Sequence, residues 1–503
     1  MRVLLDTNII IHRETGRVVN QEIGLLFRWL DKLHYGKCVH PITIQEIKKY
    51  QDAQTVKSFT IKLDNYNILK TEAPIHPLIK IINEKIDKTE NDINDSKLLN
   101  ELINNRVDIL ITEDSGILNK AEMINIQSQV FSIESFLGKI ISENPELIDY
   151  IVLSVKKDYF GNMKLQESFF DNFREDYYEF DKWFNGKADE PVYICKYGEE
   201  LGAFLYLKVE GEKENYADID PVLPSKKRLK VGTFKVSMVG LNISERFFKI
   251  IFDNALKQKV DEIYVTIFDK RPGQKLLIRQ FEEFGFKKWG IKKTKSGDEL
   301  VFVRDFTGIA DKANPLSTFP FLSKLSDVYF VSIKPEYHTE LFPDSILRTE
   351  SPDDFVENQP HRNSIRKVYI SHSFERNINT GAIIVFYRTG GIYKGVVTTL
   401  GIVESINNNI RSENDLIKAS YLRSVLTKEN LVEFWHRFPK LKPFIVNFLY
   451  AYSFPKRPTL KDLLDLGVIE GPDKLPRGFG KLSWDKLIAI IKKSGSDESI
   501  IGH

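Results

Sequence analysis

The feature that most constrains this 503-residue chain is an aspartate inside an apolar run at its start. Val3, Leu4 and Leu5 precede Asp6, and three isoleucines follow at 9–11. A short apolar run of this kind is typical of a buried strand in a parallel sheet. A carboxylate is costly to bury unless a cation shares its site. Because ligands of open parallel sheets bind at the carboxyl ends of the strands, we expect Asp6 to lie at a metal or substrate site.

Composition limits the class of protein. The length predicts two to four domains, and 42% hydrophobic with 28% charged residues is typical of a soluble globular chain. The net charge is only +2, which gives no overall basic field. The charge is uneven, however: −2 over 1–145, 0 over 146–330 and +4 over 331–503. This distribution favours a metal-using first part and a polyanion-binding last part.

Three further observations bear on location. The only cysteines, Cys38 and Cys195, match no metal-binding spacing, which is typical of a reducing compartment. No basic segment precedes the first acidic residue, Asp6, so we expect no signal peptide. No apolar run approaches the length of a membrane span. We therefore expect a cytoplasmic protein with no membrane partner.

The first 145 residues alternate between strand and helix patterns. Apolar spacing predicts helices at 20–33 and 78–86, a helix containing Glu46, and strands at 38–39, 107–112 and 130–132. Asp114 follows a strand, as Asp6 does. Asp95 falls in the first turn of a helix, where the helix dipole favours a negative group. We predict an α/β domain with a central parallel sheet over 1–145.

The order of these motifs resembles the PIN nuclease family. The resemblance is carried by LLDTNII, by Glu46 on a helix, by NDINDSKLL around Asp95 and by ITEDSGI around Asp114. It implies an acidic quartet that binds metal and carries catalysis: Asp6, Glu46, Asp95 and Asp114. It also implies supporting polar groups: Asn8, Thr112 and Ser115. Asp92 takes the place of Asp95 if the register of that helix differs by one turn.

The residue types suit hydrolysis of phosphodiesters. Oxygen ligands without histidine or cysteine select Mg²⁺ or Mn²⁺. Four neighbouring carboxylates repel one another unless divalent ions neutralise them. A pair of such ions activates water and stabilises the leaving oxygen. The alternative for any one of these acids is an ordinary helix cap.

Residues 146–325 are predicted to form an α+β domain. The aromatic segment FFDNFREDYYEFDKWF has helical spacing, which favours core packing. Strands are expected at 192–196, 203–208, 229–239, 262–268 and 299–306, with a helix at 244–258. Basic clusters at 225–230 and 287–295 are either solvated faces or phosphate contacts.

The strand–loop–helix–strand order at 229–268 and the pair Gly285–Phe286 resemble the GNAT acetyltransferase fold. The resemblance implies acetyl-CoA binding by the loop after the strand, at Val239, Gly240 and Ser244. The loop MVGLNISERF holds a single glycine, however. Phe281, which cannot donate a proton, stands where the family often has a tyrosine acid. The domain is then either a degenerate fold used for structure or binding, or an acetyltransferase with atypical cofactor contacts.

Short β-rich runs with glycine turns predict a small β-barrel in a domain over 326–503, followed by a helical tail from Leu416. The segments SIKPEYHTELF, GAIIVFYRTGG and KGVVTTLGIVES resemble the PUA-like superfamily, in particular its ASCH-type members. That resemblance implies a cleft for RNA or modified nucleic acid. It would be lined by Lys334, His372, Arg376, Tyr387 and Arg388.

Together these patterns predict a metal-dependent ribonuclease with two accessory domains that hold its RNA substrate. The resemblance to PIN toxins implies a toxin–antitoxin or phage-defence role with an antitoxin protein as partner. Homo-oligomer formation is left open. One alternative is an acetyltransferase that modifies RNA or protein. Another is a non-catalytic scaffold that binds nucleic acid.

Overall fold

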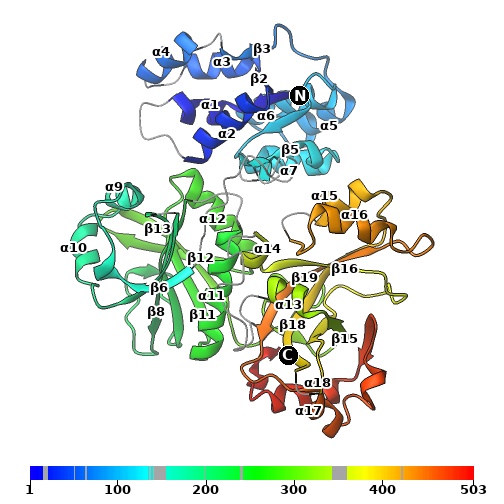
Figure 1. Cartoon of the computed structure of the whole chain (residues 1–503). Coiled ribbons are helices and arrows are strands. Elements are labelled where there is room, and N and C mark those ends of the chain that lie inside the picture. Colours follow the sequence, from blue (N-terminus) through cyan, green and yellow to red (C-terminus); the bar gives the residue numbers. More distant parts are fainter. Residues whose placement is uncertain are drawn as a thin grey trace. The chain divides into compact units, whose positions relative to one another are not determined.

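The structure of the chain is a computed structural model (Figure 1). It describes residues 1–14, 21–49, 51, 53–62, 65–133, 135–137, 140, 155–197, 199–237, 242–342, 360–392, 394–420 and 423–502. The chain divides into two compact units, residues 1–149 and 150–503. The sequence-based boundaries at 145/146 and 325/326 stay predictions.

The first unit is built on a five-stranded parallel sheet in the order β3-β2-β1-β4-β5. The strands are β1 (Arg2–Leu5), β2 (Gly36–Val39), β3 (Asn67–Ile68), β4 (Ile109–Ile111) and β5 (Val130–Phe131). The helices are α1 (Thr7–Glu14), α2 (Gln21–Lys32), α3 (Pro41–Lys48), α4 (Ala53–Lys62), α5 (Pro77–Lys85), α6 (Glu90–Ile103) and α7 (Ser115–Met123). A parallel sheet with helices between its strands agrees with the α/β prediction.

The central strand β1 is buried because it lies between two other strands and its side chains point into apolar surroundings. Val3, Leu4 and Leu5 are fully buried. The isoleucines at 9–11 do not extend the strand; they form the buried face of α1. The chain turns at Asp6, whose carbonyl accepts the Ile9 amide at 3.1 Å. Helix α1 therefore starts directly at the carboxyl end of β1.

The second unit contains an eight-stranded sheet in the order β6-β7-β8-β10-β11-β13-β12-β9. The strands are β6 (Val155–Tyr159), β7 (Pro191–Tyr197), β8 (Glu200–Glu210), β9 (Ile219–Asp220), β10 (Arg228–Val236), β11 (Glu262–Ile267), β12 (Lys287–Thr294) and β13 (Gly297–Asp305). Neighbours are antiparallel except β10 and β11. Helices α11 (Ile243–Gln258) and α12 (Pro272–Glu283) follow β10 and β11. The basic cluster at 287–295 is largely strand β12, which sequence reasoning missed because its lysines hide the alternation.

The aromatic segment after β6 behaves as its spacing predicts. It forms the short helices α9 (Asp171–Asp176) and α10 (Phe180–Asn185). Phe170, Phe180 and Phe184 pack with Phe204 of β8 in one hydrophobic cluster. These rings are core residues, as their helical spacing predicts.

The second unit also contains a six-stranded sheet in the order β16-β19-β18-β17-β15-β20 and a two-stranded parallel sheet of β14 (Leu322–Ser323) and β21 (Ile501–Gly502). The strands of the six-stranded sheet are β15 (Val328–Ile333), β16 (Arg366–Ser371), β17 (Ile383–Arg388), β18 (Val396–Asn407), β19 (Phe444–Ser453) and β20 (Phe479–Leu482). The helices of this part are α13 (Pro335–Leu341), α14 (Pro360–Asn363), α15 (Glu413–Ser420), α16 (Lys428–His436), α17 (Leu460–Asp465) and α18 (Trp484–Lys493). Over the described residues β16 and β20 are sheet edges, so the predicted barrel is not shown. The predicted helical tail also contains β19, because FIVNFLYAYS is rich in β-branched and aromatic residues.

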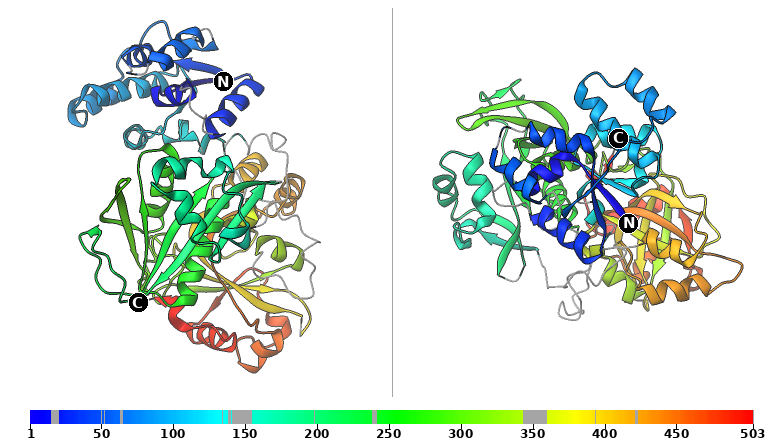
Figure 2. Two further views of the ribbon diagram at one scale, coloured as in Figure 1. Left: turned by 90° about the vertical axis from the view of Figure 1, so that its left-hand side faces the viewer. Right: turned by 90° about the horizontal axis from the view of Figure 1, so that it is seen from above.

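One hydrophobic core connects the eight-stranded and six-stranded sheets of the second unit. It includes Phe248 and Phe252 of α11, Phe319 of the connecting segment, and Phe330 of β15. Helices α17 and α18, drawn in red in Figures 1 and 2, add buried leucines and isoleucines to the same core. A shared core of this kind makes the two sheets one body.

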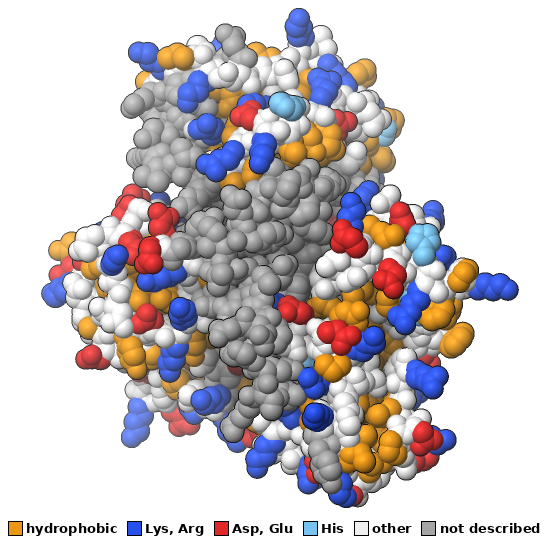
Figure 3. Space-filling view, in the orientation of Figure 1, with side chains coloured by type: hydrophobic (Ala, Val, Ile, Leu, Met, Phe, Trp, Pro, Cys, Tyr) orange, Lys and Arg blue, Asp and Glu red, His pale blue; other side chains and the backbone are white. Residues whose placement is uncertain are grey.

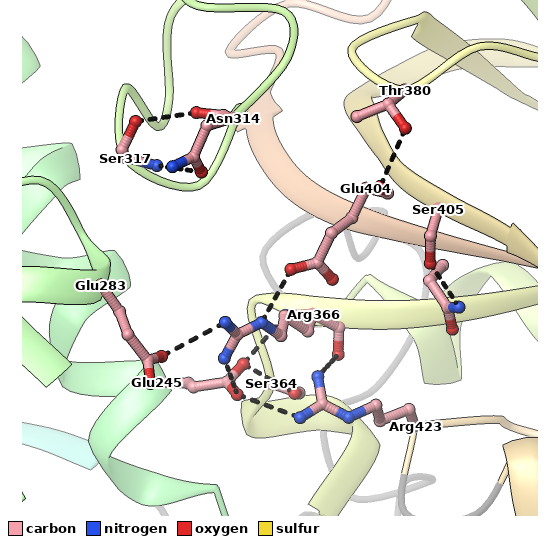
Figure 4. Close-up of polar contacts among 11 residues, drawn as sticks. Glu245, Glu283, Asn314, Ser317, Ser364, Arg366, Thr380, Glu404, Ser405 and Arg423 are labelled. Carbon is pink, nitrogen blue, oxygen red and sulfur yellow. Dashed lines mark hydrogen bonds and ion pairs between the residues drawn. The ribbon is translucent and has the colours of Figure 1, made fainter. Parts of the chain in front are cut away.

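A buried carboxylate strengthens this junction (Figure 4). Glu245, 9% exposed in the first turn of α11, accepts hydrogen bonds from the Ser364 hydroxyl at 2.8 Å and the Arg366 amide at 2.9 Å. The guanidinium of Arg423 lies 3.4 Å from its other oxygen. Burial opposes ionisation, but Arg423 and Arg366 hold the pKa of Glu245 below its ordinary value. Arg366 also contacts Glu404 at 3.0 Å.

No helix in the described part of the chain is long and apolar enough to cross a membrane.

We predict that Glu245→Gln destabilises the second unit by about 1–3 kcal/mol, because it leaves two guanidinium groups without their buried charged acceptor. Urea unfolding followed by tryptophan fluorescence measures this, since four of the five tryptophans belong to this unit. The control Glu179→Gln removes a surface partner of Lys182 and should change the free energy of unfolding by about 0.5 kcal/mol or less. Equal effects of the two variants would contradict the role given to Glu245.

Candidate functional site

The acidic residues singled out in the sequence gather at the carboxyl ends of β1 and β4. Asp6 directly follows β1, and its amide donates to the Ile111 carbonyl of β4 at 3.1 Å. Asp114 is the N-cap of α7, three residues after β4. Glu46 comes from α3 and Asp95 from α6. Four segments distant in sequence thus supply one group of carboxylates.

Asp6 is the most buried of the four, with 4% of its surface exposed. Thr112 at the end of β4 donates its hydroxyl to Asp6 Oδ2 at 2.7 Å. Burial raises the pKa of Asp6 to about 6, with Asp114 and Glu46 adding to the rise and Thr112 opposing it. Asp6 therefore ionises at a higher pH than an ordinary aspartate.

The pKa of Asp95 is raised further than that of Asp6. Burial, together with the charges of Asp114, Asp6 and Glu46, raises the pKa of Asp95 to about 7, while Lys120 opposes the rise. Lys120 itself pairs with Asp87 at 2.7 Å. Among the residues that the structure describes, no lysine or arginine forms an ion pair with any of the four acids. The repulsion among the four acids is therefore not offset by a direct ion pair with lysine or arginine in the described part of the chain.

The remaining two acids are held by polar neighbours. Glu46 accepts from Thr7 at 2.5 Å and from the Asn94 amide at 2.9 Å. Thr7 in turn contacts the Thr43 hydroxyl at 3.1 Å. Sequence reasoning missed Thr7, Thr43 and Asn94 as supporting groups, although Thr7 and Asn94 stand inside the motifs LLDTNII and NDINDSKLL.

Asp114 is both a helix cap and a member of the acidic group. Its Oδ1 accepts the amides of Gly116 at 2.6 Å and Ile117 at 3.2 Å, which is an ordinary helix cap. Its charge also acts on Asp6 and Asp95. A cap at the end of a parallel strand therefore does not exclude a part in the acidic group.

Of the other residues predicted here, Thr112 is buried beside Asp6, whereas Asn8 and Ser115 are exposed. Asp92 closes a capping box with Thr89: its Oδ2 accepts the Thr89 amide at 2.9 Å. Hydrogen bonds from the Lys88 and Thr89 amides and the Thr89 hydroxyl lower the pKa of Asp92. Asp95 rather than Asp92 interacts with the other acids.

The residues predicted to bind acetyl-CoA are only partly described. Val239 and Gly240 lie outside the described residues. Ser244 lies in the first turn of α11 and accepts from Gln280 at 3.3 Å. Phe281 is fully buried and packs against Phe248 and Phe286, with ring centroids 5.0 and 4.8 Å away.

The residues predicted to bind nucleic acid lie at different depths. Tyr387 is fully buried and stacks on Phe330, which makes it a core residue. Arg388 ends β17, and Lys334 is the N-cap of α13, 3.7 Å from Glu336. His372 and Arg376 follow β16 in a loop rich in aromatic neighbours.

The described residues contain no group of three or more His, Cys, Asp or Glu side chains arranged to hold one metal ion. Mg²⁺ keeps several waters and binds proteins through one or two carboxylates together with substrate phosphates. Paired acids with raised pKa values are the donors that suit such an ion. Oxygen donors of this type are those that Mg²⁺ or Mn²⁺ prefers, and a cation at this place would take only one or two of them directly.

Comparison with known proteins gives structural neighbours only. No protein-family model matches the chain, and no curated protein matches it. Solved acetyltransferases of the GNAT type are similar to about 30% of it. Arabidopsis thaliana Naa50 in complex with a CoA-Ac-MVNAL bisubstrate analogue has 15% identity and a TM-score of 0.23, and covers 31% of this chain and 99% of its own.

Two bacterial proteins give similar values. A GNAT family acetyltransferase from Elizabethkingia anophelis with acetyl-CoA bound has 12% identity and a TM-score of 0.22, covering 30% of this chain and 97% of its own. An N-acetyltransferase from Staphylococcus aureus Mu50 has 15% identity and a TM-score of 0.22, covering 31% and 98%. Values this low carry no argument about the activity of this chain.

We predict that the raised pKa of Asp6 makes the metal-free protein less stable as pH rises from about 4 to about 7. The folded state binds a proton in this window that the unfolded state has lost, so ionisation disfavours folding. Asp6→Asn removes this penalty. The free energy of unfolding of the variant, relative to wild type, should rise over the window by on the order of 1–3 kcal/mol.

Urea unfolding in EDTA between pH 4 and pH 8 measures the difference. Asp92→Asn is the control, because the pKa of Asp92 is lowered and its substitution should not produce this gain. A difference between wild type and Asp6→Asn that does not change with pH would show that Asp6 ionises normally.

Proposed function

We propose that the first unit is a metal-dependent phosphodiester hydrolase acting on RNA. The observation that carries this proposal is the convergence of Asp6, Glu46, Asp95 and Asp114 at the carboxyl ends of β1 and β4. Burial and the neighbouring charges raise the pKa of Asp6 to about 6 and that of Asp95 to about 7. Perturbed carboxyls at the carboxyl ends of parallel strands are typical of functional sites. If these acids were only helix caps, they would not need to lie close enough to repel one another.

The four acids would hold Mg²⁺ or Mn²⁺, which when bound supplies a Lewis acid and an activated water for attack on phosphorus. The chain's own polar groups prepare the site. Thr112 fixes one oxygen of Asp6, and Thr7 and Asn94 each hold one oxygen of Glu46. Carboxylates that are already oriented lose less conformational freedom when a cation and a phosphate enter.

RNA as substrate, a toxin–antitoxin or phage-defence role, and an antitoxin partner follow from the resemblance to PIN nucleases. The parallel sheet and the four acids at the ends of its strands support the nuclease activity on which these proposals depend. A cytoplasmic location is proposed with them.

The decisive experiment is cleavage of a labelled single-stranded RNA with Mg²⁺ or Mn²⁺, and with EDTA as the blank. We expect Asp6→Asn and Asp95→Asn to lower the cleavage rate by about 100-fold or more, since each removes a charge from the proposed cation site. Asp92→Asn, three residues from Asp95 on the same helix, is the matched control and should keep nearly full activity. Metal-independent cleavage, or equal loss in all three variants, would refute the proposed site.

A second candidate, acetyl-CoA binding by the second unit, is favoured by one observation. The parallel pairing of β10 with β11 stops at Val231 and Val265, although β10 continues along β8 to Val236. Parallel strands that separate at their carboxyl ends make room for a ligand there. Because Phe281 cannot donate a proton, the proposal is restricted to binding, with transfer to an amine as a separate question.

Acetyl-CoA should then raise the thermal midpoint of the full chain, and a concentration of 100 times the Kd would stabilise it by about 2.7 kcal/mol. Ser244→Glu places a negative charge at the start of α11 and should abolish the shift, whereas Ser168→Glu in the same unit should not. Differential scanning fluorimetry with ATP as the comparison ligand measures this. No shift with acetyl-CoA, or the same shift with ATP, would rule out a specific site.

A further inference from the structure

The carboxyl ends of β10 and β11 separate, and a lysine of β10 lies beyond the point of separation. The two strands pair as far as Val231 and Val265, and the register of β10 along β8 shifts between Val231 and Thr233. Lys235 lies four residues after the last residue of β10 that pairs with β11. We call the unpaired stretch between Lys235 and Phe268, which directly follows β11, the strand gap.

The side chain of Lys235 lies on the sheet face opposite helix α11. Its sequence neighbours, Phe234 and Val236, face the core that contains α11, and successive side chains of a strand point to opposite faces. The Lys235 ammonium accordingly lies 4.6 and 5.6 Å from the ring centroids of Phe169 and Phe173. It also donates to the Phe169 carbonyl. These contacts hold the half-buried amine with rings and a carbonyl rather than with a carboxylate.

Segment 169–177, which contains α9, crosses the strand gap on this face. Its first residues contact Lys235 on β10, as described above. At its other end, the carboxylate of Asp176 accepts from the guanidinium of Arg271 at 2.9 and 3.1 Å, and Arg271 is the N-cap of the helix that follows β11. An acyl acceptor from outside would have to displace this segment, whereas the amine of Lys235 is already beneath it.

The surroundings of Lys235 favour its neutral form. Burial lowers the pKa of the amine to about 8; the acids of α9, Asp171, Asp176 and Glu175, oppose the decrease, and the charge of Arg271 adds to it. Acidic and basic side chains are intermixed over α9 and α10 (Figure 3). Roughly a tenth of such an amine is neutral at pH 7, against well under a thousandth of an ordinary lysine. The neutral amine is the form that attacks a carbonyl carbon.

We propose that Lys235 is a self-acylation site, which accepts the acyl group of a coenzyme A thioester bound at the strand gap. This site rests on the acetyl-CoA binding proposed for the second unit, and it names the amine to which the acyl group goes. The Lys235 nitrogen attacks the thioester carbonyl, so that a C–N bond forms and the C–S bond breaks. The nitrogen loses a proton to water, and coenzyme A departs as a thiolate.

This reaction does not require the proton donor that the second unit lacks at Phe281. Thiols have a pKa of roughly 8.5, so a thiolate is a stable leaving group near neutral pH without an acid beside it. The product is an amide, which is a much poorer acyl donor than a thioester. Acylated Lys235 is therefore an end product and not an intermediate in transfer to another molecule.

Mass spectrometry of the full chain after incubation with acetyl-CoA tests the site. We expect one acetyl group per chain, located on Lys235 by peptide mapping, at a rate about 10-fold or more above that on Lys270. Lys270 is the matched comparison, because it also lies at the strand gap but is exposed, with its ammonium 3.8 Å from the Phe268 ring centroid. Lys235→Arg keeps the positive charge and should remove the label, and its thermal midpoint checks that it is folded.

Acetylation by a bound thioester differs from chemical acetylation by a free one in three readouts. The rate at Lys235 should saturate at the acetyl-CoA concentration that saturates the thermal shift, and Ser244→Glu should abolish it. The rate should rise with pH and level off above about pH 8, where the amine is neutral. The chain unfolded in urea should lose the preference for Lys235 over Lys270.

Two results separate the self-acylation site from the cofactor binding on which it rests. A thermal shift with acetyl-CoA while Lys235 stays unmodified, or reacts no faster than Lys270, would overturn the self-acylation site alone. Neither a thermal shift nor acetylation of Lys235 would overturn both proposals. A rate that grows linearly with acetyl-CoA and survives Ser244→Glu would show chemical acetylation only, which also overturns the site.

Discussion

Electrostatic repulsion among four carboxylates is the constraint on which the account of the first unit depends. The parallel sheet puts the carboxyl ends of β1 and β4 side by side, so Asp6 and Asp114 meet there, and α3 and α6 add Glu46 and Asp95. Such a group costs folding free energy in the absence of a cation, because burial and like charges disfavour ionisation. Asp114 also caps α7, whereas the hydrogen bonds that Asp6 and Glu46 accept from Thr112, Thr7 and Asn94 are ones that a neutral amide side chain also forms.

The second unit is organised differently, around a continuous apolar core and a buried ion network. Phe252 of α11 and Phe330 of β15 belong to one core, and Glu245 joins α11 to Arg366 and Arg423 beyond the connecting segment. The eight-stranded and six-stranded sheets therefore share their stability.

Much of the first unit is predictable from the sequence, because apolar runs ending in Asp6 and Glu113–Asp114 define strands and their ends together. The register of α6 is harder to predict, because both Asp92 and Asp95 lie near the start of the helix. In the structure Asp92 is used in the capping box with Thr89, which leaves Asp95 to face the other acids. Two strands of the second unit are hard to predict from their composition. The lysines of β12 interrupt the alternation of apolar and polar residues, and the aromatic residues of β19 occur in helices as well as in strands. Tyr387 shows a further limit, since its polar ring suggested a binding role and tertiary packing makes it core.

The most direct test of the acidic site is isothermal titration of the protein with Mn²⁺ at pH 7 in buffers of different ionisation enthalpy. If Asp6 and Asp95 form a cation site with raised pKa values, Mn²⁺ will bind saturably and displace protons, so the observed enthalpy will depend on the buffer. Asp95→Asn will reduce both affinity and proton release. Absence of saturable binding, or binding that releases no protons and ignores Asp95, would contradict the account.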